Sequence, residues 1–153
     1  MREAEIKNYE KLNDLAEQGG IVIFGSGADK DIPTGEIRQA FAVESKIYNR
    51  SFENLSVTES VSIYEKVIAP LAPETVLIHI GEADLTNFAG NLTEFDNKYL
   101  KLIKSIKAQN NKSRIAVVSL KNYESDPQIA EMNKHLKYVA DSEKCEYGDI
   151  SAR

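Results

Sequence analysis

The residues Gly19-Gly20-Ile21-Val22-Ile23-Phe24-Gly25-Ser26 decide the fold class. Their four apolar residues, 21–24, form a short continuous run, which is typical of a strand that is buried on both faces. Two glycines precede the run, and a loop rich in Gly, Asp and Pro follows it at 25–33. Buried strands of this kind lie in parallel sheets with helices packed on both sides.

Helical and strand periods alternate along the rest of the chain. Apolar residues on one helical face predict helices over 3–17 and from Thr93 to Asn110. Residues typical of helix starts predict further helices from Thr34 to about Val43, from Ser56 to near Pro70 and from Asp126-Pro127 onward. Short apolar runs predict further strands at 46–49, 75–80, 115–120 and 145–150. This alternation predicts one α/β domain over 1–153, a three-layer α/β/α sandwich around a flavodoxin-like, five-stranded parallel sheet with right-handed crossovers.

The composition is that of an ordinary globular chain. The 153 residues are 42% hydrophobic and carry a net charge of −5, which argues against non-specific binding to nucleic acid. No stretch approaches the roughly 20 apolar residues that span a bilayer, and the polar residues before position 21 do not resemble a signal peptide. The single cysteine, Cys145, excludes a disulfide framework. We therefore expect a cytoplasmic protein that binds neither nucleic acid nor membrane and uses no cofactor.

The loops after the strands are where a ligand is expected, because open parallel sheets bind ligands outside the carboxyl ends of their strands. The first such loop contains Gly25-Ser26-Gly27-Ala28-Asp29, a turn that could cradle a phosphate. Lys30 takes the place of the third glycine of the dinucleotide fingerprint, and no Gly-Lys-Ser/Thr follows. Three interpretations stay open: a sharp turn only, a nucleotide site, or Ser26 as a nucleophile.

The third loop, Gly81-Glu82-Ala83-Asp84, is acidic. Its carboxylates could bind a divalent cation together with Asp29 or Asp31, as oxygen ligands suit such ions. A phospho-receiver domain would place an acidic pair where Gly25-Ser26 stands, so that pattern fails. A solvated acidic loop without a metal ion is the favoured interpretation.

The two histidines lie outside the strand-end loops. His79 is inside the third predicted strand, where we expect a partly buried, hydrogen-bonded residue, and His135 is expected on the solvated face of a helix. A Ser-His-Asp relay is therefore not expected. Tyr99 and Tyr138 are predicted to pack on helix faces, and Cys145 is predicted to lie in the core rather than to act as a nucleophile.

Ordered sequence blocks resemble those of the SGNH (GDSL-like) hydrolases, which are esterases and lipases with a serine nucleophile. Residues 19–26 resemble the first block, and Tyr48-Asn49-Arg50-Ser51-Phe52 is similar to the second, usually Tyr-Asn-Arg-Gly. Residues 80–85, Ile-Gly-Glu-Ala-Asp-Leu, stand where the family has Ile-Gly-Thr-Asn-Asp-Leu. The resemblance covers essentially the whole chain and implies a flavodoxin-like fold with its site at the strand ends.

The resemblance also implies which positions would carry the catalytic groups. The nucleophile's position is Gly27, with Ser26 one residue before it. The second-block glycine, whose N–H helps to form the oxyanion hole, corresponds to Asn54. The third-block asparagine, the other oxyanion donor, corresponds to Ala83, which has no side-chain donor, and only the following Asp84 is retained.

The family's general base belongs to an Asp-x-x-His block shortly after the last strand, and residues 148–153, GDISAR, contain no histidine. Loss of one oxyanion donor typically costs ~2.7–4 kcal/mol of transition-state stabilisation, and a serine without a base is a poor nucleophile. We expect an SGNH-like domain that has lost esterase activity and serves a binding or structural role, with a small ligand, a protein or a second copy as its partner. Two alternatives stay open: a diverged serine esterase or acylhydrolase using Ser26, with Asp29 or Asp84, and a nucleotide- or metal-binding flavodoxin-like module.

Overall fold

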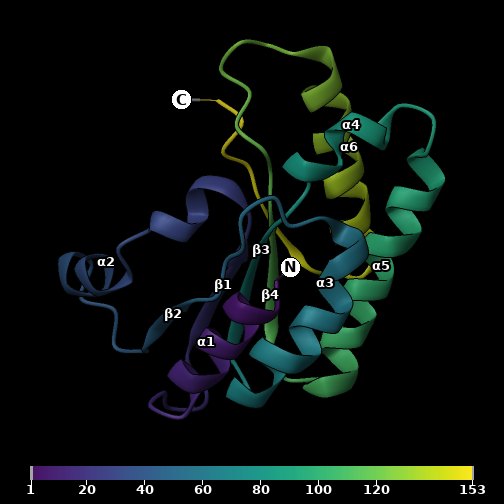
Figure 1. The fold of residues 1–153 in the computed structure, drawn as a ribbon. Helices are drawn as coiled ribbons and strands as arrows, with labels where there is room; N and C mark the ends of the chain where they lie inside the picture. Colours follow the sequence, from purple (N-terminus) through teal and green to yellow (C-terminus); the bar gives the residue numbers. More distant parts are fainter. Residues whose placement is uncertain (1, 153) are drawn as a thin grey trace.

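The computed structural model describes residues 2–152, which form a five-stranded, all-parallel sheet with the strand order β2-β1-β3-β4-β5 (Figure 1). The strands are β1 (Ile21–Gly25), β2 (Ile47–Asn49), β3 (Thr75–His79), β4 (Arg114–Val118) and β5 (Glu146–Gly148). Each strand begins and ends within two residues of its predicted position. The predicted parallel α/β architecture is therefore confirmed.

The helices are α1 (Glu3–Asn13), α2 (Thr34–Ala40), α3 (Val57–Ile63), α4 (Leu85–Phe88), α5 (Leu92–Gln109) and α6 (Pro127–Ser142). Helix α3 continues into a π-helical turn over Tyr64–Ile68 and a 3₁₀ turn over Ala69–Leu71. Two further 3₁₀ turns, Gly27–Asp31 and Glu82–Asp84, lie in segments predicted as loops, as does α4. No helix in the described part of the chain has the length and apolar character needed to cross a membrane.

Helix boundaries differ from prediction where apolar residues do not face the core. Helix α1 ends at Asn13 rather than 17, and Leu15 beyond it is 85% exposed, so its spacing does not mark a buried face. Helix α5 begins at Leu92 rather than after a Thr93 cap. The start of α6 is as predicted, because Asp126 accepts the backbone N–H of Gln128 at 2.8 Å and proline occupies the first helical position.

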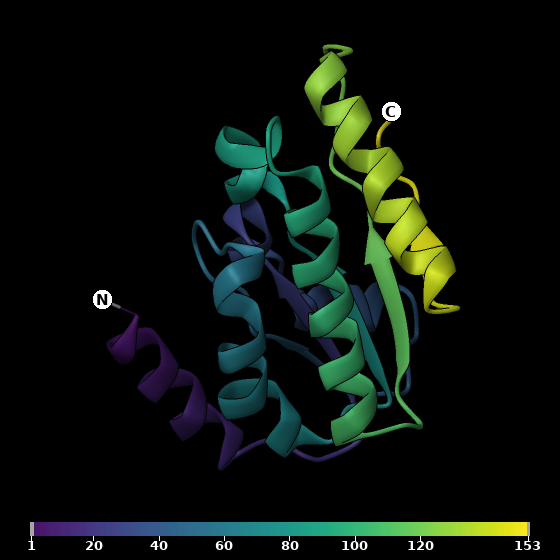
Figure 2. The same cartoon turned by 90° about the vertical axis from the view of Figure 1, so that its right-hand side faces the viewer.

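The two faces of the sheet are covered unequally. Helices α3, α5 and α6 lie side by side over one face (Figure 2), and the strand residues beneath them are at most 4% exposed: Val22, Phe24, Val76, Ile78, Ile115 and Val117. On the other side, α2 packs beside β2 near one edge (Figure 1). The side chains of Leu77, Ala116 and Val118, which alternate with the buried set, are only half-buried. The main core therefore lies between the sheet and the α3–α5–α6 layer.

A buried arginine ties α1 to the sheet. Arg50, just after β2, is 5% exposed, and its guanidinium lies 5.2 Å from the ring centre of Tyr9 and 5.4 Å from that of Tyr48. It also donates to the side-chain oxygen of Asn13 at 3.0 Å. Burial lowers the pKa of Arg50, so these cation–π contacts and hydrogen bonds offset a desolvation cost.

Candidate functional site

A crevice of about 320 Å³ lies beyond the carboxyl ends of the first three strands. It is lined by residues from the segments that follow β1, β2 and β3, namely Ser26, Gly27, Asn54, Ser56, Glu82, Ala83 and Thr86. Four of the five site positions suggested by the sequence, all except Asp84, are among them. The tertiary structure thus brings together three segments that are far apart in the chain.

Strand register explains why these segments meet. Gly25, the last residue of β1, pairs with His79, the last residue of β3, so both strands end at the same level. Ser26 forms an isolated parallel bridge with Phe52, which brings the segment after β2 to the same edge. The backbone N–H of Gly25 also donates to the hydroxyl of Ser51 at 3.1 Å.

Position 27 faces a carboxylate. Gly27 has φ +64°, a left-handed conformation that favours glycine. A Cβ atom placed on Gly27 would lie 3.3 Å from Oε2 of Glu82. The resemblance puts a serine nucleophile at position 27. In this chain that position has no side chain, and the carboxylate of Glu82 lies beside it.

The two oxyanion-hole positions also differ from the family pattern. Asn54 has φ +54°, a left-handed conformation that asparagine tolerates better than most residues. Ala83 lies in the 3₁₀ turn Glu82–Asp84 and contributes a methyl group in place of a donor. The retained Asp84 accepts the backbone N–H of Val57 at 3.0 Å and lines a neighbouring pocket instead of the crevice.

Beside the crevice, Asp29 joins the segment of Ser26 to His79. One carboxylate oxygen, Oδ2, accepts the backbone N–H of Ser26 at 3.3 Å and lies 2.6 Å from Nδ1 of His79. A Cβ atom on Gly25 would lie 2.8 Å from Cγ of Asp29, so this close approach requires glycine at position 25. His79 is partly buried and hydrogen-bonded as predicted, but its pairing with Asp29 was not foreseen.

His79 does not complete a catalytic relay in this structure. Its Nε2 atom is buried and has no hydrogen-bond partner among the described residues. Neither His79 nor Asp29 lines the crevice. Ser26 is 5% exposed, and no hydrogen bond joins its hydroxyl to either histidine within residues 2–152.

The prediction for His135 was wrong. Its side chain is 19% exposed rather than solvated, because α6 packs against α5 and places Nδ1 2.8 Å from Oδ1 of Asp96. Its ring also packs edge-on against Phe88, with centroids 5.3 Å apart. Tyr138, predicted to pack, is instead 57% exposed, whereas Tyr99 is fully buried as predicted.

The carboxylates predicted as possible metal ligands have other partners or face solvent. Asp29 pairs with His79, Asp84 accepts the Val57 N–H, and both Asp31 and Glu82 are exposed. Within residues 2–152, no group of three or more His, Cys, Asp or Glu side chains has the arrangement of a metal site. Cys145 is half-buried against the core, and burial raises the pKa of its thiol, which does not favour a nucleophilic role.

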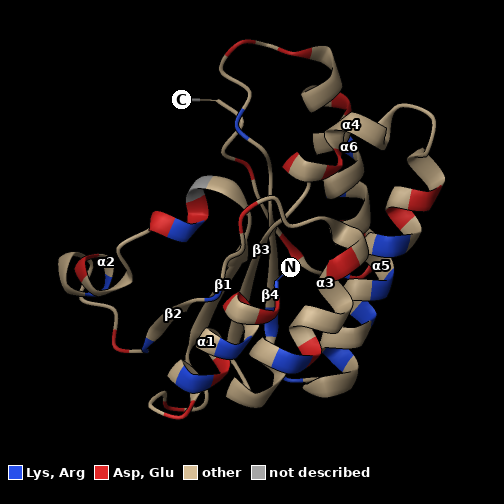
Figure 3. Ribbon diagram, in the orientation of Figure 1, with Lys and Arg blue, Asp and Glu red and all other residues tan. Residues whose placement is uncertain are grey.

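Three residues of the crevice were not predicted to line a ligand site of this kind: Ser56, Thr86 and Glu82, the last of which was considered only as a metal ligand. Glu82 had a usable signal, because it stands where the family block has threonine. Ser56 was predicted only as part of a capping box, and the backbone N–H of Ser56 does donate to Glu59 at 3.3 Å. Nothing in the sequence around Thr86 indicated a crevice residue. Figure 3 shows that the segments after β1 and β3 both carry acidic residues.

Comparison with known proteins establishes the fold. No family model matches the sequence, and no curated protein matches it significantly. A Streptococcus pneumonia protein provisionally described as a platelet activating factor is 16% identical with a TM-score of 0.80, covering 97% of this chain and 74% of its own. A GDSL-like lipase from Bacteroides thetaiotaomicron is 15% identical with a TM-score of 0.72, covering 94% and 77%. An acetylxylan esterase from Geobacillus stearothermophilus is 14% identical with a TM-score of 0.65, covering 86% and 76%. The chain thus has the SGNH-hydrolase fold, as its sequence blocks predicted.

Proposed function

We propose that this chain is a non-hydrolytic domain with the SGNH-hydrolase fold, which binds a small polar ligand in the crevice at the strand ends. The observation that carries the proposal is the carboxylate of Glu82 beside Gly27. Ester hydrolysis needs hydrogen-bond donors where the oxyanion develops. A carboxylate beside that position would instead repel the developing negative charge, and water reduces this repulsion because Glu82 is exposed.

The surroundings of Ser26 support the same proposal. A serine hydroxyl becomes a useful nucleophile when a base takes its proton. His79 pairs with Asp29 through Nδ1, but its Nε2, the atom that would take the serine proton, is buried with no hydrogen-bond partner among residues 2–152. His135 pairs with Asp96 between α5 and α6. Neither histidine therefore acts as a base toward Ser26 in the described arrangement.

The lining of the crevice favours a neutral ligand that carries hydroxyl groups. Ser26, Ser56 and Thr86 can each donate and accept a hydrogen bond, as can the amide of Asn54. The charge of Glu82 disfavours phosphates and carboxylates. Because the acetylxylan esterase mentioned above acts on acetylated xylan, a methyl xyloside is a reasonable first probe.

The loss of hydrolysis is tested with a fluorophosphonate probe, read by intact mass, beside an assay with a short-chain nitrophenyl ester. Wild type and Ser26→Ala are compared, with an active esterase as the positive control. We expect no adduct and no turnover above the Ser26→Ala background. A stoichiometric adduct on wild type that is absent from Ser26→Ala would overturn the proposal.

The binding role is tested by a ¹H–¹⁵N NMR titration with methyl β-xyloside. We expect saturable shifts in residues 26–27, 54–56 and 82–86, weakened at least tenfold in Glu82→Ala. Glu10→Ala, on the exposed side of α1, is the matched control and should bind like wild type. If the shifts do not saturate, or if they map elsewhere, a polyol ligand for this crevice is excluded.

One observation favours a second candidate, a diverged serine acylhydrolase. Asp29 links the backbone of Ser26 to His79, so a histidine–aspartate pair lies next to the segment that carries the Ser26 hydroxyl. In that case His79→Asn would abolish measured turnover, whereas His135→Asn would not.

A further inference from the structure

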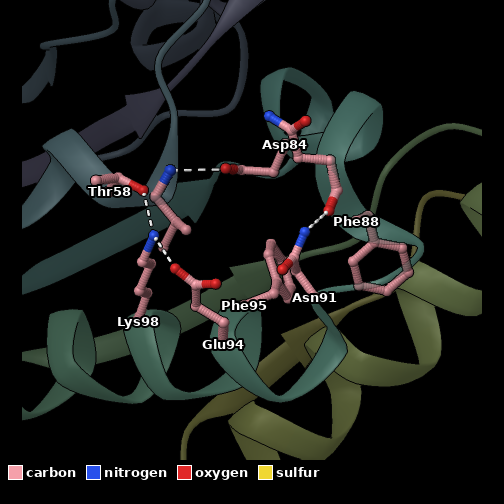
Figure 4. A pocket seen from close by; sticks show the side chains of 9 residues that line it. Thr58, Asp84, Phe88, Asn91, Glu94, Phe95 and Lys98 are labelled. Atoms are coloured by element: carbon pink, nitrogen blue, oxygen red, sulfur yellow. Dashed lines mark hydrogen bonds and ion pairs between the residues drawn. The ribbon is translucent and has the colours of Figure 1, made fainter.

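A second pocket, of about 240 Å³, lies between the start of α3, helix α4 and the first turns of α5 (Figure 4). It shares no lining residue with the crevice at the strand ends. Its polar lining consists of Thr58, Asp84, Asn87, Asn91, Glu94 and Lys98. None of its residues takes part in the function proposed for the crevice.

The cation of the pocket is already neutralised by its neighbours. The ammonium of Lys98 lies 2.9 Å from Oε1 of Glu94 and donates to the hydroxyl of Thr58 at 3.0 Å. Figure 4 shows these two contacts along one side of the pocket. The lining contains one ammonium and two carboxylates, so its formal charge is −1.

Hydrogen-bond acceptors remain free on the other side of the pocket. Asp84 uses Oδ2 to accept the backbone N–H of Val57 at 3.0 Å, which leaves Oδ1 without a hydrogen-bond partner among residues 2–152. Asn91 uses its Nδ2 to donate to the backbone carbonyl of Asn87 at 2.8 Å, which leaves its side-chain oxygen as an acceptor. A ligand that supplies donors would therefore pair with Asp84 and Asn91 on this side.

Part of the wall is apolar. The rings of Phe88 and Phe95 meet edge-to-face with centroids 5.2 Å apart and are only 2% and 4% exposed. They belong to the main core, so their positions are set by packing. Burial also raises the pKa of Asp84, although the Val57 N–H and the Lys98 ammonium act to lower it, so the ionised carboxylate would gain from a further cation.

We propose that this pocket binds a small organic ammonium ion, with the ammonium donating to Asp84 and the side-chain oxygen of Asn91 and with the hydrocarbon part against Phe88 and Phe95. Free acceptors and a net negative lining select a cationic donor. The apolar wall selects a compact hydrocarbon group in preference to a bare cation. The pocket is smaller than the ~300–1,000 Å³ of drug-sized sites, so the ligand is correspondingly small.

The test is an NMR titration with two probes of nearly the same shape, benzylammonium and neutral benzyl alcohol, at pH 7.5. We expect benzylammonium to shift the side-chain amides of Asn87 and Asn91 and the backbone amides of α4 in a saturable way. Benzyl alcohol should bind at least tenfold more weakly. Equal binding of both probes would identify an unselective apolar cavity and overturn the proposal, as would shifts confined to the crevice around Glu82 or an absence of saturable binding.

A matched pair of variants tests whether the charge of Asp84 binds the ammonium group. In Asp84→Asn the amide oxygen can still accept the Val57 N–H, so the start of α3 is kept while the charge is lost. We expect benzylammonium affinity to fall at least tenfold in Asp84→Asn and to remain unchanged in Asp141→Asn, which alters an exposed carboxylate on α6. Unchanged affinity in a folded Asp84→Asn would overturn the assignment, and the comparison of the two probes on wild type tests the proposal without any variant.

Discussion

The two histidines of the chain form histidine–aspartate pairs that look alike and sit in different regions. Nδ1 of His79 lies 2.6 Å from Asp29 beside the crevice, and Nδ1 of His135 lies 2.8 Å from Asp96 between α5 and α6. The histidine side chains are 20% and 19% exposed. Geometry and burial of the pair alone would not separate a site residue from a packing residue.

What separates the two pairs is the second ring nitrogen and the partners of the aspartate. Nε2 of His135 lies 3.5 Å from Glu131, whereas Nε2 of His79 is buried with no partner among residues 2–152. Asp29 also accepts the Ser26 N–H, so the pair of His79 is part of the frame of the crevice. The His79–Asp29 pair therefore supports the turn that follows Ser26, and its proximity to Ser26 does not by itself make a catalytic relay.

The largest expected effect comes from the glycine that makes room for Asp29. Gly25→Ala places a Cβ against the Asp29 carboxylate and should lower the free energy of unfolding by roughly 3 kcal/mol, as overpacking does. Gly35→Ala, in α2 with no atom within 4 Å, should be neutral or stabilising by up to ~1 kcal/mol. Urea denaturation measures both, and similar values for the two variants would show that the frame around Asp29 tolerates displacement.

The two aspartates provide the next contrast. Asp29→Ala removes the hydrogen-bond partner of both the His79 ring and the Ser26 N–H. The free energy of unfolding should fall by roughly 2 kcal/mol, because these two buried groups then lack a hydrogen bond. Asp96→Ala should cost about 1 kcal/mol, because His135 keeps its contact with Glu131. The measurement is again urea denaturation, and a larger loss for Asp96→Ala would reverse the comparison.

The histidines themselves should differ in the opposite order. In His79→Asn the amide nitrogen can take the place of Nδ1 beside Asp29, and the unpartnered Nε2 is removed. We therefore expect the free energy of unfolding to fall by about 1 kcal/mol or less. His135→Asn loses the edge-on contact with Phe88 and the contact with Glu131, which together are worth about 1–2 kcal/mol. Thermal unfolding and ester turnover are measured on both, and turnover lost only in His79→Asn would favour the acylhydrolase candidate.

The smallest expected effects concern two carboxylates near the start of α3 that pair with no histidine. Burial raises the pKa of Asp84 despite its hydrogen bond from Val57. Burial also raises that of Glu59, but the hydrogen bonds from Arg2 and Ser56 outweigh it, and the pKa of Glu59 is lowered. The folded state therefore favours protonated Asp84 and ionised Glu59.

The signs of the pH dependence follow from these directions. Protonated Asp84 stabilises the folded state, and this stabilisation is lost as pH rises from the unfolded pKa of Asp84 through its raised folded pKa. Ionised Glu59 also stabilises the folded state, and this stabilisation is lost as pH falls from the unfolded pKa of Glu59 through its lowered folded pKa. At pH 7 we expect Asp84→Asn to raise the melting temperature and Glu59→Gln to lower it, each by about 1–3 °C. Both differences should shrink below pH 4, and a difference that is independent of pH would show that charge is not the cause.

Much of the fold followed from local patterns. The apolar run 21–24 predicted β1, and the residues Asp126-Pro127 predicted the start of α6, because a continuous apolar run and a helix cap can both be recognised from adjacent residues. Helix α4 was missed, since its four residues are too few to show a helical period. His135 was placed on the wrong side because the lysines around it suggested solvent, while the packing of α6 on α5 is a long-range contact.

The candidate site divides in the same way. Sequence blocks alone placed Ser26, Gly27, Asn54 and Ala83 at one edge of a parallel sheet, because parallel strands bring their carboxyl ends together, and the crevice contains all four. The sequence also placed a glycine and an alanine at the two positions where the resemblance implies a serine and an asparagine. Only the tertiary structure decided that Glu82 faces Gly27, that Asp29 pairs with His79 and that Asp84 serves another pocket. Each of these contacts joins segments separated by a strand and a crossover, and their side-chain directions depend on strand register and turn geometry rather than on local periodicity.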